Sequence, residues 1–263
     1  MNDTRLRLPL VLAALPLICF LVLPLAGLLL RVSAEDILAT FLDAQAAQAV
    51  ALSVTTTLTT VLIAVVLGTP AAYLIARKKF PGKNVLDALV DLPVVLPPSV
   101  AGIALLVTFG RRGVLGGMLA SCGIELPFTQ AAVVMAQVFV AAPLYVRTIA
   151  VAFASVDRDL ELAAAIDGAS PWQAFLSVTL PLSVRGAVGG AIMTWARALG
   201  EFGATIIFAG NFPGRTQTMP LAIYMGFELD LRVALTLAAI LLVTSFAVLA
   251  VVKGMAGRWT APA

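Results

Sequence analysis

The sequence contains no histidine and only two cysteines, Cys19 and Cys122, among its 263 residues. Without histidine, the chain lacks the side chain that most often ligates metals and acts as a general base near neutral pH. Cys19 lies in an apolar run and Cys122 in a predicted loop, so the pair gives neither a disulfide framework nor a metal-ligand spacing. A membrane-embedded enzyme is therefore disfavoured, because the chain offers no metal motif and no nucleophile with a base.

Charged residues are also scarce: they make up 12% of the chain, whereas hydrophobic residues make up 61%. An ordinary soluble domain has about 25% charged and about 45–50% apolar residues. A water-soluble core cannot absorb so much apolar surface. The net charge of +3 does not indicate nucleic-acid binding, because the basic residues lie between apolar runs and form no single basic face. We therefore expect an all-α protein whose environment is the lipid membrane and which binds no nucleic acid.

Six segments have the length and apolar composition of membrane spans. They cover residues 9–30, 50–76, 91–109, 130–153, 186–209 and 232–253. The first follows Arg5 and Arg7 as a signal-peptide core would, but it exceeds the usual length of about 7–15 residues, so we expect it to be retained. Pro93, Pro97 and Pro98 interrupt the start of the third, which leaves a broken span or a preceding re-entrant turn open.

Basic residues predict the orientation, because cytoplasmic loops of membrane proteins carry an excess of lysine and arginine. One set of connections holds Arg5, Arg7, Arg77, Lys78, Lys79, Lys83, Arg158, Arg185, Lys253 and Arg258; the other holds Arg31, Arg111, Arg112, Arg215 and Arg232. The first set is twice as large, although Arg111 and Arg112 oppose the trend. We therefore expect a multi-pass membrane protein with both termini and the 77–90 and 154–185 loops in the cytoplasm. No loop is long enough for a soluble domain, so residues 1–263 are predicted to form one membrane domain.

Residues 157–181 have the sequence pattern of two short helices. Acidic residues at the start favour the positive end of a first helix, its Ala-rich middle has high helix propensity, and Gly168 suits the position after its end. Ser170 followed by Pro171 is an N-cap with proline at the first helical position, and Pro181 is expected to end the second helix.

The second of these helices has one mainly apolar face at helical spacing, made by Trp172, Phe175, Leu176 and Thr179. A bent pair of helices with such a face fits a groove on another protein. From the pattern alone, a surface helix lying on the lipid interface is the favoured alternative.

The same segment resembles the EAA loop of ABC-transporter permeases, in which Glu-Ala-Ala is followed by a glycine and then by Leu-Pro before a membrane helix. The matching residues are Ala163, Ala164, Gly168, Leu180 and Pro181. Leu162 stands where the family has glutamate, and Glu161 is displaced by one position. The resemblance implies that residues 157–181 form the coupling helix that docks into an ATP-binding subunit. Its predicted coupling residues are Glu161, Leu162, Ala163, Ala164, Gly168 and Ala169.

The chain contains no G-x-x-x-x-G-K-[ST] motif, the loop that cradles nucleotide phosphates. An energy source is needed for uptake against a gradient. The resemblance therefore implies that a partner subunit binds ATP and magnesium and hydrolyses the ATP. This chain is then expected to be a transport subunit, not an enzyme, and to hold no cofactor.

The predicted fifth span carries ionisable residues near mid-membrane. Arg197 and Glu201 are four residues apart and share one face of a continuous helix, and Thr194 and Thr205 extend that stripe. Ionisable residues at this depth are costly and usually face a partner, a cavity or a pathway. For a divalent anion, Arg197 would attract and Glu201 would prevent permanent retention. A mutually neutralised pair that locks two helices together is an equal alternative.

Gly186 and Gly190 form a G-x-x-x-G at the start of the same span. This spacing allows close approach of two helices. It leaves a dimer interface and packing within the chain equally open.

The stretch Arg-Ala-Leu-Gly-Glu-Phe-Gly-Ala-Thr over residues 197–205, with the loop that continues to Tyr224, closely resembles molybdate permeases. Sulfate permeases share the Gly-Glu-Phe-Gly portion but are less similar in the following loop. That loop contains Pro213-Gly214, a tight-turn signal on the outer side. It could meet a periplasmic binding protein.

The two resemblances together cover most of the chain and imply a type I ABC importer permease fold. They imply the membrane subunit of a molybdate importer in the inner (plasma) membrane, working as a homodimer with two copies of an ATP-binding subunit and a periplasmic molybdate-binding protein. Tungstate is not separable from molybdate, because the two tetrahedral dianions are nearly the same size. A permease for sulfate or another oxyanion, and an ion-coupled secondary transporter using Arg197 and Glu201, are the alternatives.

Overall fold

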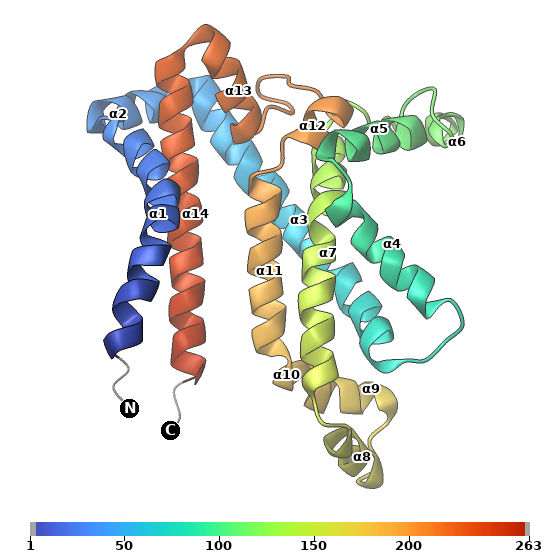
Figure 1. Cartoon of the computed structure of the whole chain (residues 1–263). Helices are drawn as coiled ribbons and strands as arrows, with labels where there is room; N and C mark the ends of the chain where they lie inside the picture. The colour runs from blue at the N-terminus through green and yellow to red at the C-terminus, as the bar shows by residue number, and fades with distance from the viewer. Residues whose placement is uncertain (1–3, 261–263) are drawn as a thin grey trace.

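The computed structural model describes residues 4–260, and within that range the side chains other than those of residues 4–9, 41, 251–253 and 255–260. The described residues form helices joined by short connections, with no strand among them. Four basic residues used to predict the orientation, Arg5, Arg7, Lys253 and Arg258, lie outside the described side chains. Figure 1 shows the long helices running between two ends at which the shorter helices gather.

Four helices are long and apolar enough to span a membrane by themselves. They are α1 (Thr4–Leu30), α3 (Ala44–Arg77), α7 (Gln130–Ser155) and α14 (Leu231–Thr260). They coincide with the predicted first, second, fourth and sixth spans. Two further candidates are bent helix pairs, so the described residues give up to six spans if each pair crosses once.

The predicted third span, residues 91–109, is interrupted near the prolines at its start. It is divided into α4 (Lys83–Val95) and α5 (Pro98–Phe109), which are bent by 116°. Pro97 and Pro98 explain the break, because proline supplies no backbone N–H and disfavours helical backbone at the residue before it. The two residues between the helices accordingly have extended ψ angles of 138° and 134°. The predicted interruption is therefore observed, and a bend of this size fits either a broken span or a re-entrant turn.

The predicted fifth span is wrong as a continuous helix over residues 186–209. It is divided into α11 (Val184–Leu199) and α12 (Gly203–Phe208). Gly200, which caps α11, has the low helix propensity of glycine, and the backbone at Phe202 has φ −127° and ψ −52°. The four predicted pathway residues therefore do not form one helical stripe.

The shorter helices lie at the two ends of the molecule. They are α2 (Ala34–Leu42), α6 (Gly116–Ser121), α8 (Arg158–Ile166), α9 (Pro171–Ala174), the π-helix η1 (Phe175–Thr179), α10 (Leu180–Leu182) and α13 (Met219–Leu229). In Figure 1, α8, α9 and α10 lie at the bottom, and α2, α5, α6, α12 and α13 at the top. We call the first end the α8–α10 end and the second the α12–α13 end. The described start of α1 and end of α14 point toward the α8–α10 end.

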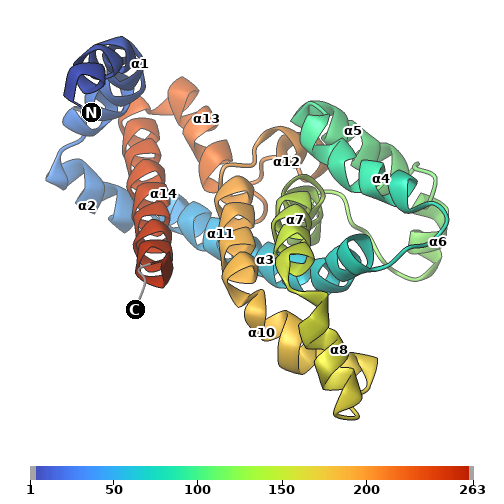
Figure 2. The same ribbon diagram turned by 60° about the horizontal axis from the view of Figure 1, so that its bottom comes forward.

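The centre of the fold is a bundle of α3, α7 and α11. Tyr145 and Phe153 of α7 are fully buried in it. Figures 1 and 2 place α1, α2 and α14 on one side of this bundle and α4, α5 and α6 on the other. The bundle thus positions residues 157–181 at the α8–α10 end and the break between α11 and α12 nearer the α12–α13 end.

The two glycines of the G-x-x-x-G pack within this bundle. A Cβ on Gly186 would lie 2.3 Å from the Cβ of Ala152, and one on Gly190 would lie 3.1 Å from the Cβ of Thr148. Both neighbours belong to α7 of the same chain. Of the two alternatives that the spacing left open, close packing of α11 on α7 is therefore the one observed.

Candidate functional site

The segment 157–181 begins as the sequence predicts, with two short helices around a glycine. The Asp157 side chain accepts a hydrogen bond from the backbone N–H of Asp159 and starts α8. Gly168 follows α8 with φ +89°. Ser170 and Gln173 then form a capping box that starts α9. The prediction of two short helices separated by a glycine is confirmed, and that glycine is in the left-handed region.

The second helix does not end at Pro181 as predicted. The chain passes through the π-turn of η1, in which the backbone N–H of Leu180 donates to the carbonyl of Phe175, five residues earlier. Proline has no N–H to donate, so the wider turn lets helical backbone continue across it. The helix ends at Leu182, and at Ser183 the chain bends by 68° into α11.

Glu161 joins the loop to the helix bundle. Its carboxylate accepts a hydrogen bond from the Thr179 hydroxyl and lies 3.4 Å from Nη2 of Arg77, the last residue of α3. The same nitrogen donates to the Val156 carbonyl over 2.6 Å. Both charged side chains are largely covered. Glu161 therefore links α8 to α3 and η1 and does not point into solvent.

The predicted apolar face of the second helix is divided between the fold and the surface. Phe175 and Thr179 are buried, and the Phe175 ring meets the Tyr73 ring edge to face at 4.9 Å. Trp172 stacks on Phe175 with ring centroids 5.5 Å apart but stays mostly exposed, and Leu176 is 44% exposed. Part of the face anchors the loop to α3, and part remains available to another surface.

The exposed side of the loop combines apolar side chains with a hollow that both apolar and charged residues line. Leu160, Leu162, Ile166 and Trp172 are exposed, and a hollow of about 380 Å³ opens between α8, α9 and the end of α3. Of the predicted coupling residues, Leu162, Ala163 and Gly168 are exposed, and Glu161, Ala164 and Ala169 are partly covered. The segment thus offers a shaped, mixed surface at the α8–α10 end.

The predicted pathway residues lie around the break between α11 and α12. Nη1 of Arg197 lies 2.8 Å from Oε2 of Glu201, whose Oε1 accepts the backbone N–H of Ala204 over 2.8 Å. The side chain of Glu201 is 1% exposed and that of Arg197 is 32% exposed. Thr194 and Thr205 are fully buried, and the Thr205 hydroxyl has no hydrogen-bond partner among the described residues. The structure brings the ion pair together and leaves only its arginine partly open.

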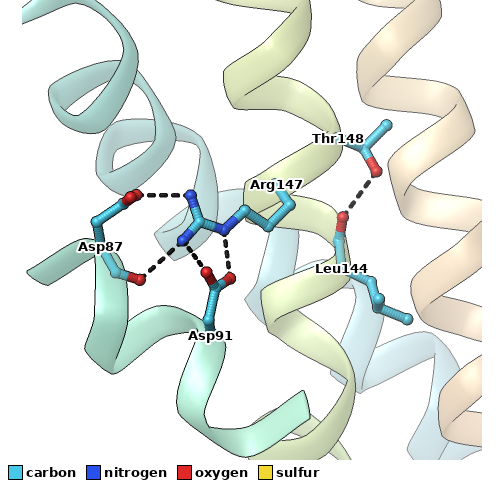
Figure 3. Close-up of polar contacts among 5 residues, drawn as sticks. All are labelled: Asp87, Asp91, Leu144, Arg147 and Thr148. Carbon is cyan, nitrogen blue, oxygen red and sulfur yellow. Dashed lines mark hydrogen bonds and ion pairs between the residues drawn. The ribbon is translucent and has the colours of Figure 1, made fainter. Parts of the chain in front are cut away.

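A second ionic cluster was missed by the sequence interpretation. Figure 3 shows the Arg147 side chain reaching from α7 to Asp87 and Asp91 of α4. Nη1 and Nη2 of Arg147 donate to the side chain and backbone carbonyl of Asp87, over 2.6 and 2.8 Å, and Nε and Nη2 donate to the two carboxylate oxygens of Asp91. The signal that could have found it is Arg147 itself, because an arginine inside an apolar span requires a partner.

The carboxylates of the spans are therefore engaged by arginines of the same chain. Within the part of the chain that the structure describes, no group of three or more His, Cys, Asp or Glu side chains could hold a metal ion. The two clusters differ in what they can do chemically. The guanidinium of Arg197 has one carboxylate partner and is partly open to an anion, whereas that of Arg147 is engaged by two carboxylates.

Comparison with known proteins places the chain in a family. The family model of the binding-protein-dependent transport system inner membrane component matches residues 64–253. The molybdenum transport system permease protein ModB of Mycobacterium tuberculosis is 40% identical over 228 residues, 87% of this chain and 86% of that protein. The molybdate/tungstate transport system permease protein WtpB of Thermococcus kodakarensis is 36% identical over 244 residues, 92% of each chain.

A solved structure supports the same fold. The bacterial alginate ABC transporter, crystallised in complex with its alginate pentasaccharide-bound periplasmic protein, matches with a TM-score of 0.77 over 98% of this chain and 96% of that chain, at 18% identity. The predicted all-α, type I ABC importer permease fold is thereby confirmed. The matched region contains α4 to α12, and with them both the 157–181 loop and the Arg197–Glu201 pair. This chain therefore belongs to the family of binding-protein-dependent transport system inner membrane components, multi-pass membrane proteins that act as transport permeases.

Proposed function

We propose that this chain is the membrane subunit of an ABC importer that takes up molybdate, and tungstate as a nearly isosteric dianion. The observation that carries the proposal is sequence identity of 40% and 36%, over most of the chain, with permeases named for molybdenum and for molybdate/tungstate. The partly open Arg197, held by Glu201, suits a divalent anion that must be bound and released. A permease for sulfate or another oxyanion is the alternative that the experiment below must separate.

The proposed energy source is an ATP-binding subunit that docks on residues 157–181 and itself binds ATP and magnesium. Leu162, Ile166 and Trp172 support this docking, because exposed apolar side chains that gather on one surface mark a protein contact. Ile166 is 86% exposed at the end of α8. The lipid interface is the alternative occupant of this surface, and a measurement of how tightly the ATP-binding subunit binds distinguishes the two.

The remaining proposed partners are a second copy of this chain and a periplasmic molybdate-binding protein. The window of α1 at Leu10–Leu30 has none of its residues buried, so the chain leaves an apolar helix for lipid or for a second copy to cover. At the α12–α13 end, the exposed turn at Pro213-Gly214 is suited to the periplasmic protein. With two copies of the ATP-binding subunit, this arrangement puts both termini and residues 157–181 in the cytoplasm.

Coupling then follows from how the loop is attached. Closure of two ATP-binding subunits would push the two 157–181 loops together. The Glu161–Arg77 contact would pass that movement to α3, and the bend at Ser183 would pass it to α11. Movement of these two helices in both copies converts an inward-facing pathway into an outward-facing one. The transported anion needs no covalent chemistry from this chain.

Reconstituted vesicles test the function. The chain, its ATP-binding subunit and its periplasmic binding protein are placed in liposomes, and uptake of labelled molybdate is followed with and without ATP. We expect uptake that depends on ATP and on both partners, competed by tungstate and not by sulfate. Uptake competed by sulfate alone would move the assignment to the alternative. Gradient-driven uptake by the chain without partners would overturn the ABC importer proposal.

The docking surface gives a direct prediction. Ile166→Asp is expected to weaken binding of the ATP-binding subunit at least tenfold, because removing a central apolar contact from an interface costs about 2 kcal/mol or more. The matched control is Val114→Asp, which changes a residue 81% exposed at the other end of the molecule. Titration of the subunit onto each variant in nanodiscs measures the effect. Unchanged affinity for Ile166→Asp would favour the lipid interface as the occupant of this surface.

A further inference from the structure

The Arg147 cluster joins α4 to the bundle, beside Leu86 and Val90 of α4, which pack against the bundle's apolar core. The guanidinium of Arg147 binds both carboxylates, one through Nη1 and the other through two of its nitrogens, as Figure 3 shows. Yet the three side chains are not sealed: Arg147 is 32%, Asp87 41% and Asp91 52% exposed. The cluster is therefore formed within the chain and still open on one side.

The depth of the cluster determines what can cover that open side. Arg147 lies eight residues before Ser155, where α7 ends, or about 12 Å along the helix axis. It thus lies inside the apolar span, where charged side chains face water or protein and not lipid tails. The opposite face of α4 carries the exposed apolar residues Val85, Leu89 and Leu92, which suit lipid. Helix α4 accordingly separates an apolar side from a polar side.

The charge of the cluster distinguishes water from protein. With all three groups ionised, two carboxylates on one guanidinium leave a formal charge of −1. A dry protein interface is a poor place for an uncompensated charge, because its desolvation is not repaid by a partner. A water-filled space accommodates it. A water-filled space on the polar side of α4 is therefore the covering that fits this charge.

We propose that Asp87, Asp91 and Arg147 line a water-filled part of the translocation pathway. There the two carboxylates occupy the Arg147 guanidinium, so that a tetrahedral divalent oxyanion passes without being retained. This inference rests on the proposed transport function and adds residues to its pathway.

The position of the cluster gives the pathway a direction. Arg197 lies thirteen residues into α11, about 20 Å from its start, whereas Arg147 is about 12 Å from the end of α7. Both of these helix ends lie at the α8–α10 end (Figure 1). Arg197 has one carboxylate, and Arg147, nearer that end, has two. The affinity for a dianion thus falls toward the α8–α10 end, which is the exit of an importer.

Water accessibility tests the lining without any transport. In a background carrying Cys19→Ser and Cys122→Ser, the assembled transporter is given a single cysteine by Val151→Cys or by Leu89→Cys. Val151 is one helical turn from Arg147 and 71% exposed, and Leu89 is on the opposite face of α4 and 58% exposed. We expect a charged, membrane-impermeant thiol reagent to label the Val151 position at least tenfold faster. Equal or slower labelling than at Leu89 would overturn the proposal, whatever the transported anion is.

Transport kinetics test the role of the carboxylates. The double variant Asp87→Asn and Asp91→Asn exposes the Arg147 charge, so we expect both KM and the maximal rate of molybdate uptake, per assembled transporter, to fall at least threefold. Asp87→Asn alone, which keeps both bonds to Asp91, should show the same direction with a smaller change. Glu125→Gln, which removes the exposed partner of Arg111, is the matched control and should change neither value. An unchanged KM in both aspartate variants would reduce the cluster to a structural clamp and overturn the proposal.

Discussion

Gly168→Val is expected to lower ATP-dependent uptake at least tenfold while leaving the amount of folded protein in the membrane nearly unchanged. Gly168 has φ +89°, and a Cβ at this position would meet no atom within 4 Å. The substitution therefore adds no clash with its surroundings and acts through the backbone alone. A β-branched residue in the left-handed region costs about 1–3 kcal/mol, and 1.4 kcal/mol is about a factor of ten in an equilibrium. The angle between α8 and α9 should then relax, and with it the fit to the ATP-binding subunit.

Two controls separate the angle from a general effect of strain. Gly123→Val places the same kind of residue at φ +72°, also with no atom within 4 Å, but in the loop after α6. It should leave the coupling of ATP hydrolysis to uptake intact. Gly168→Asn should retain more uptake than Gly168→Val, because asparagine tolerates the left-handed region better. Equal uptake by the Val and Asn variants, measured per folded transporter, would contradict the bent-helix account of coupling.

The loop around Gly168 could be predicted in detail because its signals are local. Asp157 and Ser170 each cap a helix within three residues of their own position, and glycine at the end of a helix often adopts positive φ. The long helices α3, α7 and α14 could also be predicted from the sequence, because their apolar runs far exceed the length of a buried helix in a soluble protein. Pro181 did not end the second helix as predicted, because the π-turn of η1 carries the helical backbone across it to Leu182 and has no local sequence signal.

The breaks and the ion clusters were harder to predict, because their causes lie elsewhere in the chain. Gly200 resembles the many glycines that membrane helices tolerate, so it gave no sign that the helix ends there. The partners of Arg147 lie 56 and 60 residues earlier, Asp87 in the predicted 77–90 loop and Asp91 at the first residue of the predicted third span. Likewise, Glu161 fails to match the family position, yet its contact with Arg77 gives it a defined place. Such contacts become visible only when distant segments are brought together.

Arg197→Gln is expected to have the largest effect of any single change near the α11–α12 break. It leaves the Glu201 carboxylate, 1% exposed, without its cationic partner. Removing one member of a buried ion pair costs about 3–5 kcal/mol. Glu201→Gln should be far milder, because the amide oxygen can still accept the N–H of Ala204 and Arg197 is open enough to be hydrated. Thermal unfolding of the assembled transporter should therefore rank Arg197→Gln well below Glu201→Gln.

The double variant decides between the two roles of the pair. With Arg197→Gln and Glu201→Gln together, no buried charge remains unpaired, so assembly should recover to a level near that of Glu201→Gln alone. If the pair only fastens α11 to α12, molybdate uptake recovers along with assembly. If Arg197 attracts the anion, molybdate uptake by the double variant stays low although the complex assembles. Uptake by Glu201→Gln alone is then also low, because the anion is released from Arg197 more slowly. We expect the second result, because the partly open guanidinium faces an uncovered side of the chain while its carboxylate is held by the backbone.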